Sequence, residues 1–202
     1  MKGITDPAIP VVASRDRRCR GWTLDNWLRR WWAPATAEAD LLAIRPGQHV
    51  VDLGTGVGYL VPVLLERVGP EGTVDLVDPD RRNLSLAEAR WGTDARVRVM
   101  CTSAAHLPEV PNGSVDRVLL SLVLCCMVDK EGAMEEAWRM LRPGGLALIT
   151  YPERRRRLSA QKRTLRVSPE LWSRLIVGHP WHVVESGRHR WIRRHVLEKP
   201  TS

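Results

Sequence analysis

Asp52-Leu53-Gly54-Thr55-Gly56-Val57-Gly58 lies between two apolar segments, Val50-Val51 before it and Tyr59-Leu60-Val61 after it. This order predicts a strand that ends near an acid, then a tight glycine turn, then a helix. Glycine at every second position permits the turn and lets a ligand approach the backbone closely. Dehydrogenases space their glycines as G-x-G-x-x-G, and here the third glycine comes one residue too early. The acid disfavours a pyrophosphate and favours a ligand with a positive charge, so a nicotinamide dehydrogenase is disfavoured.

The segments around this motif alternate between apolar strands and helices, which predicts an α/β fold with a parallel sheet covered on both faces. The last two strands, with a turn at Gly187 between them, predict an antiparallel hairpin. Strands are expected at His49–Leu53, Thr73–Val77, Val97–Cys101, Val115–Leu124, Leu146–Tyr151, Trp181–Ser186 and Trp191–Leu197. Helices are expected at Thr36–Ala43, from the glycine turn to Arg67, at Arg81–Trp91, at Lys130–Leu141 with a C-cap in Arg142–Gly145, and from a Ser168 cap to Val177.

The motif from Asp52 to Gly58 resembles motif I of the class I S-adenosylmethionine (SAM) dependent methyltransferases, whose cofactor carries an ammonium group and a sulfonium. The resemblance implies a Rossmann-like, seven-stranded, mostly parallel sheet with helices on both faces and a C-terminal antiparallel hairpin. It implies SAM as the cofactor and S-adenosylhomocysteine as the product. We expect residues 1–32 to form an N-terminal arm with an amphipathic cap helix, and residues 33–202 to form the SAM-binding domain.

The ends of the strands supply the expected cofactor contacts, because ligands of open α/β sheets bind beyond the carboxyl ends of the strands. Asp78 after the second strand is placed to accept both ribose hydroxyls. Family members often carry an aspartate near the adenine, where this chain has Ser103, which hydrogen-bonds with less charge assistance. The cofactor-binding residues implied are Asp52, Gly54, Thr55, Gly56, Gly58, Tyr59, Asp78, Pro79, Ser103, Ala104 and Ser121.

The reaction implied is an in-line displacement on an activated carbon, for which alignment and desolvation supply much of the acceleration. A general base is needed only if the nucleophile starts protonated, so the catalytic residue stays unknown. Candidates are His106, Tyr151, Glu153, His179 and His182, whereas His189 and His195 look peripheral. Substrate contacts are expected from Trp27, Trp31, Cys125, Tyr151 and Arg154; the two tryptophans share a face of a helix that Thr23 would cap.

Residues at the end of the fourth strand exclude several acceptor classes. Ser121–Leu124 stands where amino-directed nucleic-acid methyltransferases carry a Pro-Pro-aromatic tetrapeptide. Cys125 follows leucine rather than the proline of cytosine-C5 enzymes, and Asp129 alone supplies no acidic metal cluster. The chain is most similar to the broad small-molecule group of the family. The prediction is therefore methyl transfer to a small molecule, without a metal.

Composition limits the remaining options. The 202 residues are 44% hydrophobic, enough for one well-formed core, and the formal charge is +8. The basic run at residues 154–157 suits an anionic substrate or nucleic acid, although it lacks the interleaved aromatics of a single-strand binding groove. An RNA or protein methyltransferase, or a SAM-binding protein that transfers no methyl group, stays open as an alternative.

Neither a signal-peptide core nor a membrane span is evident, so a cytoplasmic protein without membrane contact is expected. The cysteine spacings fit no zinc site, and the oligomeric state is left open.

Overall fold

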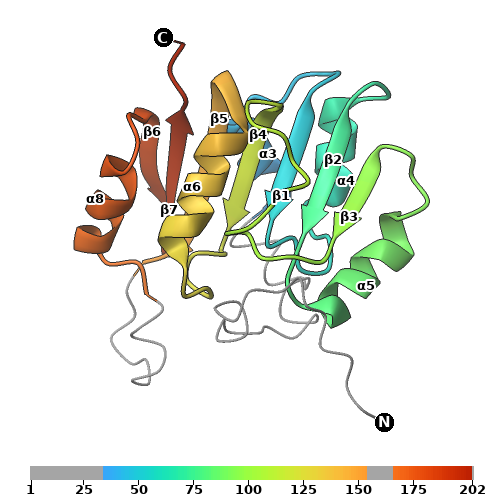
Figure 1. The fold of residues 1–202 in the computed structure, drawn as a ribbon, viewed down its shortest axis with the longest axis horizontal. Helices are drawn as coiled ribbons and strands as arrows, with labels where there is room; N and C mark the ends of the chain where they lie inside the picture. Colours follow the sequence, from blue (N-terminus) through green and yellow to red (C-terminus); the bar gives the residue numbers. More distant parts are fainter. Residues whose placement is uncertain (1–33, 154–165, 202) are drawn as a thin grey trace.

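The computed structural model describes residues 34–153 and 166–201. They form a seven-stranded sheet in the order β3-β2-β1-β4-β5-β7-β6 (Figure 1). Neighbouring strands among β1 to β5 pair in parallel, and β7 pairs antiparallel with both β5 and β6. The strands are β1 (His49–Leu53), β2 (Thr73–Val77), β3 (Val97–Met100), β4 (Val115–Ser121), β5 (Leu141–Pro152), β6 (His182–His189) and β7 (Ile192–Glu198). The predicted fold class is confirmed.

Helices cover both faces of the sheet because each strand of the centre is apolar on both sides. One apolar cluster joins Val50 and Leu119 of the sheet to Leu64 and Ala87, and the other joins Leu120 to Met134. Figure 1 shows α6 in front of the sheet and α3 and α4 behind it. The described helices are α3 (Ala35–Leu41), α4 (Val61–Val68), α5 (Arg81–Trp91), α6 (Lys130–Met140) and α8 (Pro169–Val177).

Side-chain caps fix where three of these helices begin. Asp80 accepts a hydrogen bond from the Arg82 N–H at the start of α5, and Asp129 accepts one from the Gly132 N–H in α6. The predicted Ser168 cap is present, because its hydroxyl accepts from the Leu171 N–H. Such caps satisfy backbone donors that have no partner within the helix.

Three expected boundaries were wrong. The hairpin turns at Arg190-Trp191, not at Gly187, which lies within β6 and pairs with Arg194. β4 ends at Ser121 rather than at Leu124, because Leu122 adopts a left-handed φ of 60° that turns the chain out of the sheet. Arg142–Gly145 forms no helix cap: β5 begins at once with Leu141, and the irregular register lies within this glycine-containing segment.

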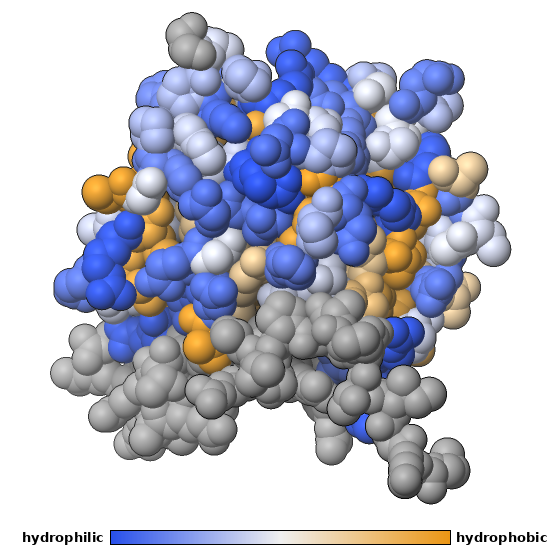
Figure 2. Space-filling model, viewed as in Figure 1, coloured by the Kyte–Doolittle hydropathy of each residue, from blue (hydrophilic) through white to orange (hydrophobic). Residues whose placement is uncertain are grey.

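Most of the face seen in Figure 2 is hydrophilic, with apolar side chains visible in separate areas between polar ones. Among the described helices, none is both long enough and apolar enough to cross a membrane. The predicted cap helix around Trp27 and Trp31 and the basic run that begins at Arg154 lie outside the described residues.

Candidate active site at the carboxyl edge of the sheet

The glycine loop after β1 is fastened to the end of β2. The N–H groups of Gly54 and Thr55 both donate to the Val77 carbonyl, at 2.7 and 2.9 Å, and the Gly58 N–H donates to the Thr55 carbonyl at 3.1 Å. Gly54, Gly56 and Gly58 have φ values of 74°, 60° and 79°. Residues with a Cβ adopt these values at a cost, so the backbone favours glycine at all three positions.

Close packing adds a second requirement for glycine. A Cβ at Gly54 would overlap the Val123 side chain, and one at Gly58 would lie 3.1 Å from the Trp91 ring. Val123 reaches the loop because the chain turns at Leu122, whose N–H donates to the Thr150 carbonyl at 3.0 Å. The loop is thus enclosed by α5 on one side and by the chain after β4 on the other.

Asp78 links the glycine loop to the start of α5. Its Oδ2 accepts from the Gly56 N–H at 2.9 Å, and its Oδ1 accepts from the Asp80 N–H at 2.8 Å. Burial raises the pKa of Asp78 to about 6, although both backbone donors favour the ionised form. Each oxygen has further lone pairs with which to accept a hydroxyl. The carboxylate can therefore hold the loop and a ligand diol together.

Polar groups without partners lie at the same edge. Thr55 Oγ1 and Ser121 Oγ are buried and have no hydrogen-bond partner among the described residues. Asp52, at the end of β1, is 2% exposed. An unsatisfied buried hydroxyl costs about 1–3 kcal/mol, so such groups are expected where a ligand completes the site. Of the other expected contacts, Pro79 is half-buried and Tyr59 belongs to the apolar cluster around α4.

The loop after β3 carries the residues expected near the adenine. Ser103 and Ala104 are each 4% exposed. Ser103 Oγ accepts from the Ala105 N–H at 3.2 Å, and Thr102 donates to the His106 carbonyl at 2.8 Å. The Ser103 hydroxyl is therefore engaged within its own loop, and the His106 side chain is exposed.

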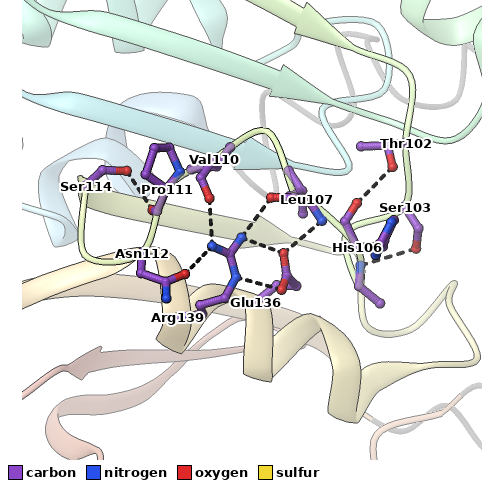
Figure 3. A network of polar contacts seen from close by, with 11 residues as sticks. Thr102, Ser103, His106, Leu107, Val110, Pro111, Asn112, Ser114, Glu136 and Arg139 are labelled. Atoms are coloured by element: carbon purple, nitrogen blue, oxygen red, sulfur yellow. Dashed lines mark hydrogen bonds and ion pairs between the residues drawn. The ribbon is translucent and has the colours of Figure 1, made fainter. Parts of the chain in front are cut away.

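Two side chains of α6 hold this loop, and the sequence analysis missed both (Figure 3). Arg139 donates to the carbonyls of Leu107 and Val110 and to Asn112 Oδ1, at 2.8, 2.7 and 2.7 Å. Glu136 accepts from the Leu107 N–H at 2.8 Å and pairs with Arg139. Burial opposes ionisation of Glu136, but these donors hold its pKa below the ordinary value. The i, i+3 spacing of the pair was the only signal in the sequence.

Tyr151 is part of a buried polar chain on the face of α6 and α8. Its hydroxyl lies 3.0 Å from His195 Nε2, and His195 Nδ1 lies 2.7 Å from Ser186 Oγ. The Trp172 ring stacks on His195 with 4.0 Å between centroids. Burial raises the pKa of Tyr151 to about 12 and lowers that of His195 to about 4, so both are neutral at pH 7. His195, which looked peripheral in the sequence, is buried.

The other catalytic candidates lie apart from Tyr151 or are already paired. Glu153 accepts from both Arg188 and Arg193, and these hydrogen bonds lower its pKa, which makes it a poor proton acceptor. His182 pairs with Glu198, at the strand ends opposite the glycine loop. His179 lies 2.6 Å from Glu135 and stacks on Trp138.

Cys125 follows β4 on the same edge as the glycine loop. Its thiol donates to the Leu122 carbonyl at 3.1 Å and lies 3.7 Å from Cys126 Sγ. The other expected substrate contacts, Trp27, Trp31 and Arg154, fall outside the described residues. Within residues 34–153 and 166–201 there is no cluster of three or more His, Cys, Asp or Glu side chains that could hold a metal ion.

Comparisons with known proteins agree with this geometry. Residues 51–149 match the family model described as a methyltransferase domain. The chain is 37% identical over 110 residues to a ubiquinone/menaquinone biosynthesis C-methyltransferase of Xanthomonas oryzae pv. oryzae, covering 52% of this chain and 43% of that protein. The chain thus spans less than half the length of this relative.

Solved structures share the fold. A SAM-dependent methyltransferase from Aquifex aeolicus superposes with a TM-score of 0.76 at 17% identity, over 90% of this chain and 100% of that one. A geranyl diphosphate C-methyltransferase from Streptomyces coelicolor A3(2) gives a TM-score of 0.70 at 15% identity, over 83% of this chain and 75% of that one. The glycine loop, the match of residues 51–149 to a methyltransferase domain and the strand order agree, and they make this chain similar to the class I SAM-dependent methyltransferases.

Proposed function

We propose that this protein is a SAM-dependent methyltransferase that transfers a methyl group to a small-molecule acceptor. The observation that carries the proposal is the hydrogen bond from the Gly56 N–H to the buried Asp78 carboxylate. This carboxylate retains lone pairs that can accept hydrogen bonds from a ligand diol. The relative from Xanthomonas oryzae is named a C-methyltransferase of quinone biosynthesis, which supports a small-molecule acceptor.

The cofactor would lie across the carboxyl ends of β1, β2 and β3. The Asp52 carboxylate and the loop from Gly54 to Gly58 would bind the methionine part, with the Thr55 hydroxyl as a further donor or acceptor. Asp78 and the adjacent Pro79 would hold the ribose. Ser103 and Ala104 would flank the adenine on a loop fixed by Arg139.

When bound, SAM supplies a methyl group on a positively charged sulfur, which is already activated for displacement. The chain's own work is then to align the acceptor with that carbon and to exclude water. Ser121, at the end of β4, would lie between the cofactor, bound across the ends of β1 to β3, and an acceptor bound beyond β4. Tyr151 lies one strand further along, with its hydroxyl hydrogen-bonded to His195.

Calorimetric titration with SAM, S-adenosylhomocysteine and NAD tests the cofactor. We expect both adenosyl ligands to bind, NAD not to bind, and Asp78→Ala to weaken SAM binding much more than Glu71→Ala, which removes an exposed carboxylate. Transfer of labelled methyl from SAM to a soluble naphthoquinol or benzoquinol then tests the reaction. Binding without transfer to any small acceptor would favour a non-methylating protein of this fold, and transfer to RNA alone would favour the nucleic-acid alternative.

A further inference from the structure

Three polar residues form a row across adjacent strands at the carboxyl edge. Strands β4, β5 and β7 lie side by side in the sheet (Figure 1). Ser121 of β4 is in register with Thr150 of β5, and Thr150 is in register with Arg194 of β7. Residues in register on neighbouring strands share a face, and Leu119, Leu148 and Val196 place this face on the side of α4. The row therefore lies on the opposite side of the sheet from Tyr151 and His195. Two strand spacings, roughly 10 Å, separate its ends.

The row is polar beside the apolar residues Leu119, Leu148 and Val196 of the same face, and its two ends lack hydrogen-bond partners among the described residues. Ser121 Oγ and Arg194 Nε are both buried atoms, and neither has a hydrogen-bond partner in the described part of the chain. Thr150, at the centre, is fully buried and its hydroxyl accepts from the Leu122 N–H at 3.1 Å. A buried guanidinium N–H without an acceptor is costly, which indicates that an acceptor group completes the row.

The surroundings of Arg194 leave space for such a group. The residue paired with Arg194 on β6 is Gly187, which has no side chain. A Cβ at Gly187 would meet only Glu185 Oε1, at 3.9 Å, so the one described group next to this space is a carboxylate that forms no ion pair with Arg194. The neighbouring arginines of the hairpin, Arg188 and Arg193, are instead neutralised by Glu153. Arg194 thus differs from them in having no ion pair to a described carboxylate.

We infer that the row from Ser121 to Arg194 binds the methyl acceptor through an anionic oxygen, and that the acceptor class is an acidic hydroxyl compound such as a phenol or enol. This inference rests on the proposed function. Arg194 supplies a planar fork of donors that suits the oxyanion, and the Ser121 hydroxyl, at the other end of the row, supplies a donor for a different polar atom of the acceptor. The acceptor binds already ionised, with its proton released to solvent, so no side chain has to remove that proton.

The test uses 4-nitrophenol, whose ionised form has its own visible absorbance, with S-adenosylhomocysteine saturating the protein. At a pH about one unit below the pKa of the free probe, we expect binding to increase the absorbance of the phenolate. Arg194→Gln should weaken binding about tenfold or more, because a charge-assisted hydrogen bond is lost. Ser121→Ala should weaken it less, and neutral nitrobenzene should bind poorly.

Arg188→Gln is the matched control, because it removes the same charge from the same hairpin but from a group paired with Glu153. Its affinity for the probe should equal that of the parent. Arg194→Lys keeps the positive charge but loses the planar set of guanidinium donors, so it should bind the probe with intermediate affinity. This variant keeps the test valid if Arg194→Gln fails to fold. Equal losses in Arg188→Gln and Arg194→Gln, binding of the neutral phenol, or no binding by the parent would each overturn the inference. Binding of S-adenosylhomocysteine is measured separately: its absence would refute the proposed function, whereas its presence without binding of the phenolate would refute only the anion site.

Discussion

Replacing Gly54 by alanine separates backbone strain from close packing at the glycine loop. Gly54 has a φ of 74°, and its added Cβ would overlap the Val123 side chain. A residue other than glycine pays about 1–2 kcal/mol in this region, and overpacking adds about 1–3 kcal/mol. We therefore expect Gly54→Ala to lower the free energy of unfolding by about 2–5 kcal/mol. SAM affinity should fall as well, because the loop is displaced.

Gly113→Ala is the control for this change, because Gly113 has a φ of 63° and nothing lies within 4 Å of its added Cβ. It should cost only the strain, about 1–2 kcal/mol, and leave SAM affinity unchanged. Urea unfolding of both variants measures the difference. Adding Val123→Ala to Gly54→Ala should recover about 1 kcal/mol or more as coupling in a double-mutant cycle. If Gly54→Ala costs no more than Gly113→Ala, the close approach of Val123 is irrelevant and the packing argument fails.

Three further outcomes are expected. Since the pKa of Asp78 is about 6, SAM affinity should fall by up to about tenfold per pH unit below 6, and calorimetry should find no such dependence in Asp78→Asn. Arg139→Gln should cost about 2–4 kcal/mol and speed amide exchange across residues 101–114, whereas Arg142→Gln should leave that exchange unchanged. His195 has a pKa of about 4 when folded against 6.5 when unfolded, so the unfolded state takes up the proton first as the pH falls. Between pH 7 and 4.5 the parent should therefore lose about 1–3 kcal/mol more stability than His195→Gln, and equal losses in urea titrations would contradict this.

The sheet and its glycine loop could be predicted because their signals are local. Val50-Val51, the spaced glycines and the apolar runs of the later strands each carry their periodicity within a few residues. Asp78 could be placed at the same edge as the loop because parallel strands end together. The hydrogen bond from the Gly56 N–H to the Asp78 carboxylate agrees with that placement.

The features that the sequence did not predict arise from contacts between segments that are distant in the chain. Arg139 bonds to carbonyls 29 and 32 residues away, and Tyr151 meets His195 across 44 residues, so no local pattern could show either. The hairpin was misplaced because Gly187 is the favoured turn residue, yet pairing with β7 carries β6 on to His189. An edge strand tolerates glycine, and Arg190 takes the left-handed turn position instead.

The position of β7 between β5 and β6 has a consequence for synthesis on the ribosome. A nascent chain released as far as β5 can already assemble β1 to β5, and with them the glycine loop, Asp78 and Ser121. β6 has no neighbour in the sheet until β7 has also emerged, because β7 separates it from β5. The chain leaves the ribosome from its N-terminus, so β1 to β5 become available for pairing before β6 and β7 do. Because a domain folds as a unit, the sheet edge from Ser121 to Arg194 is completed only after the C-terminal hairpin has been synthesised.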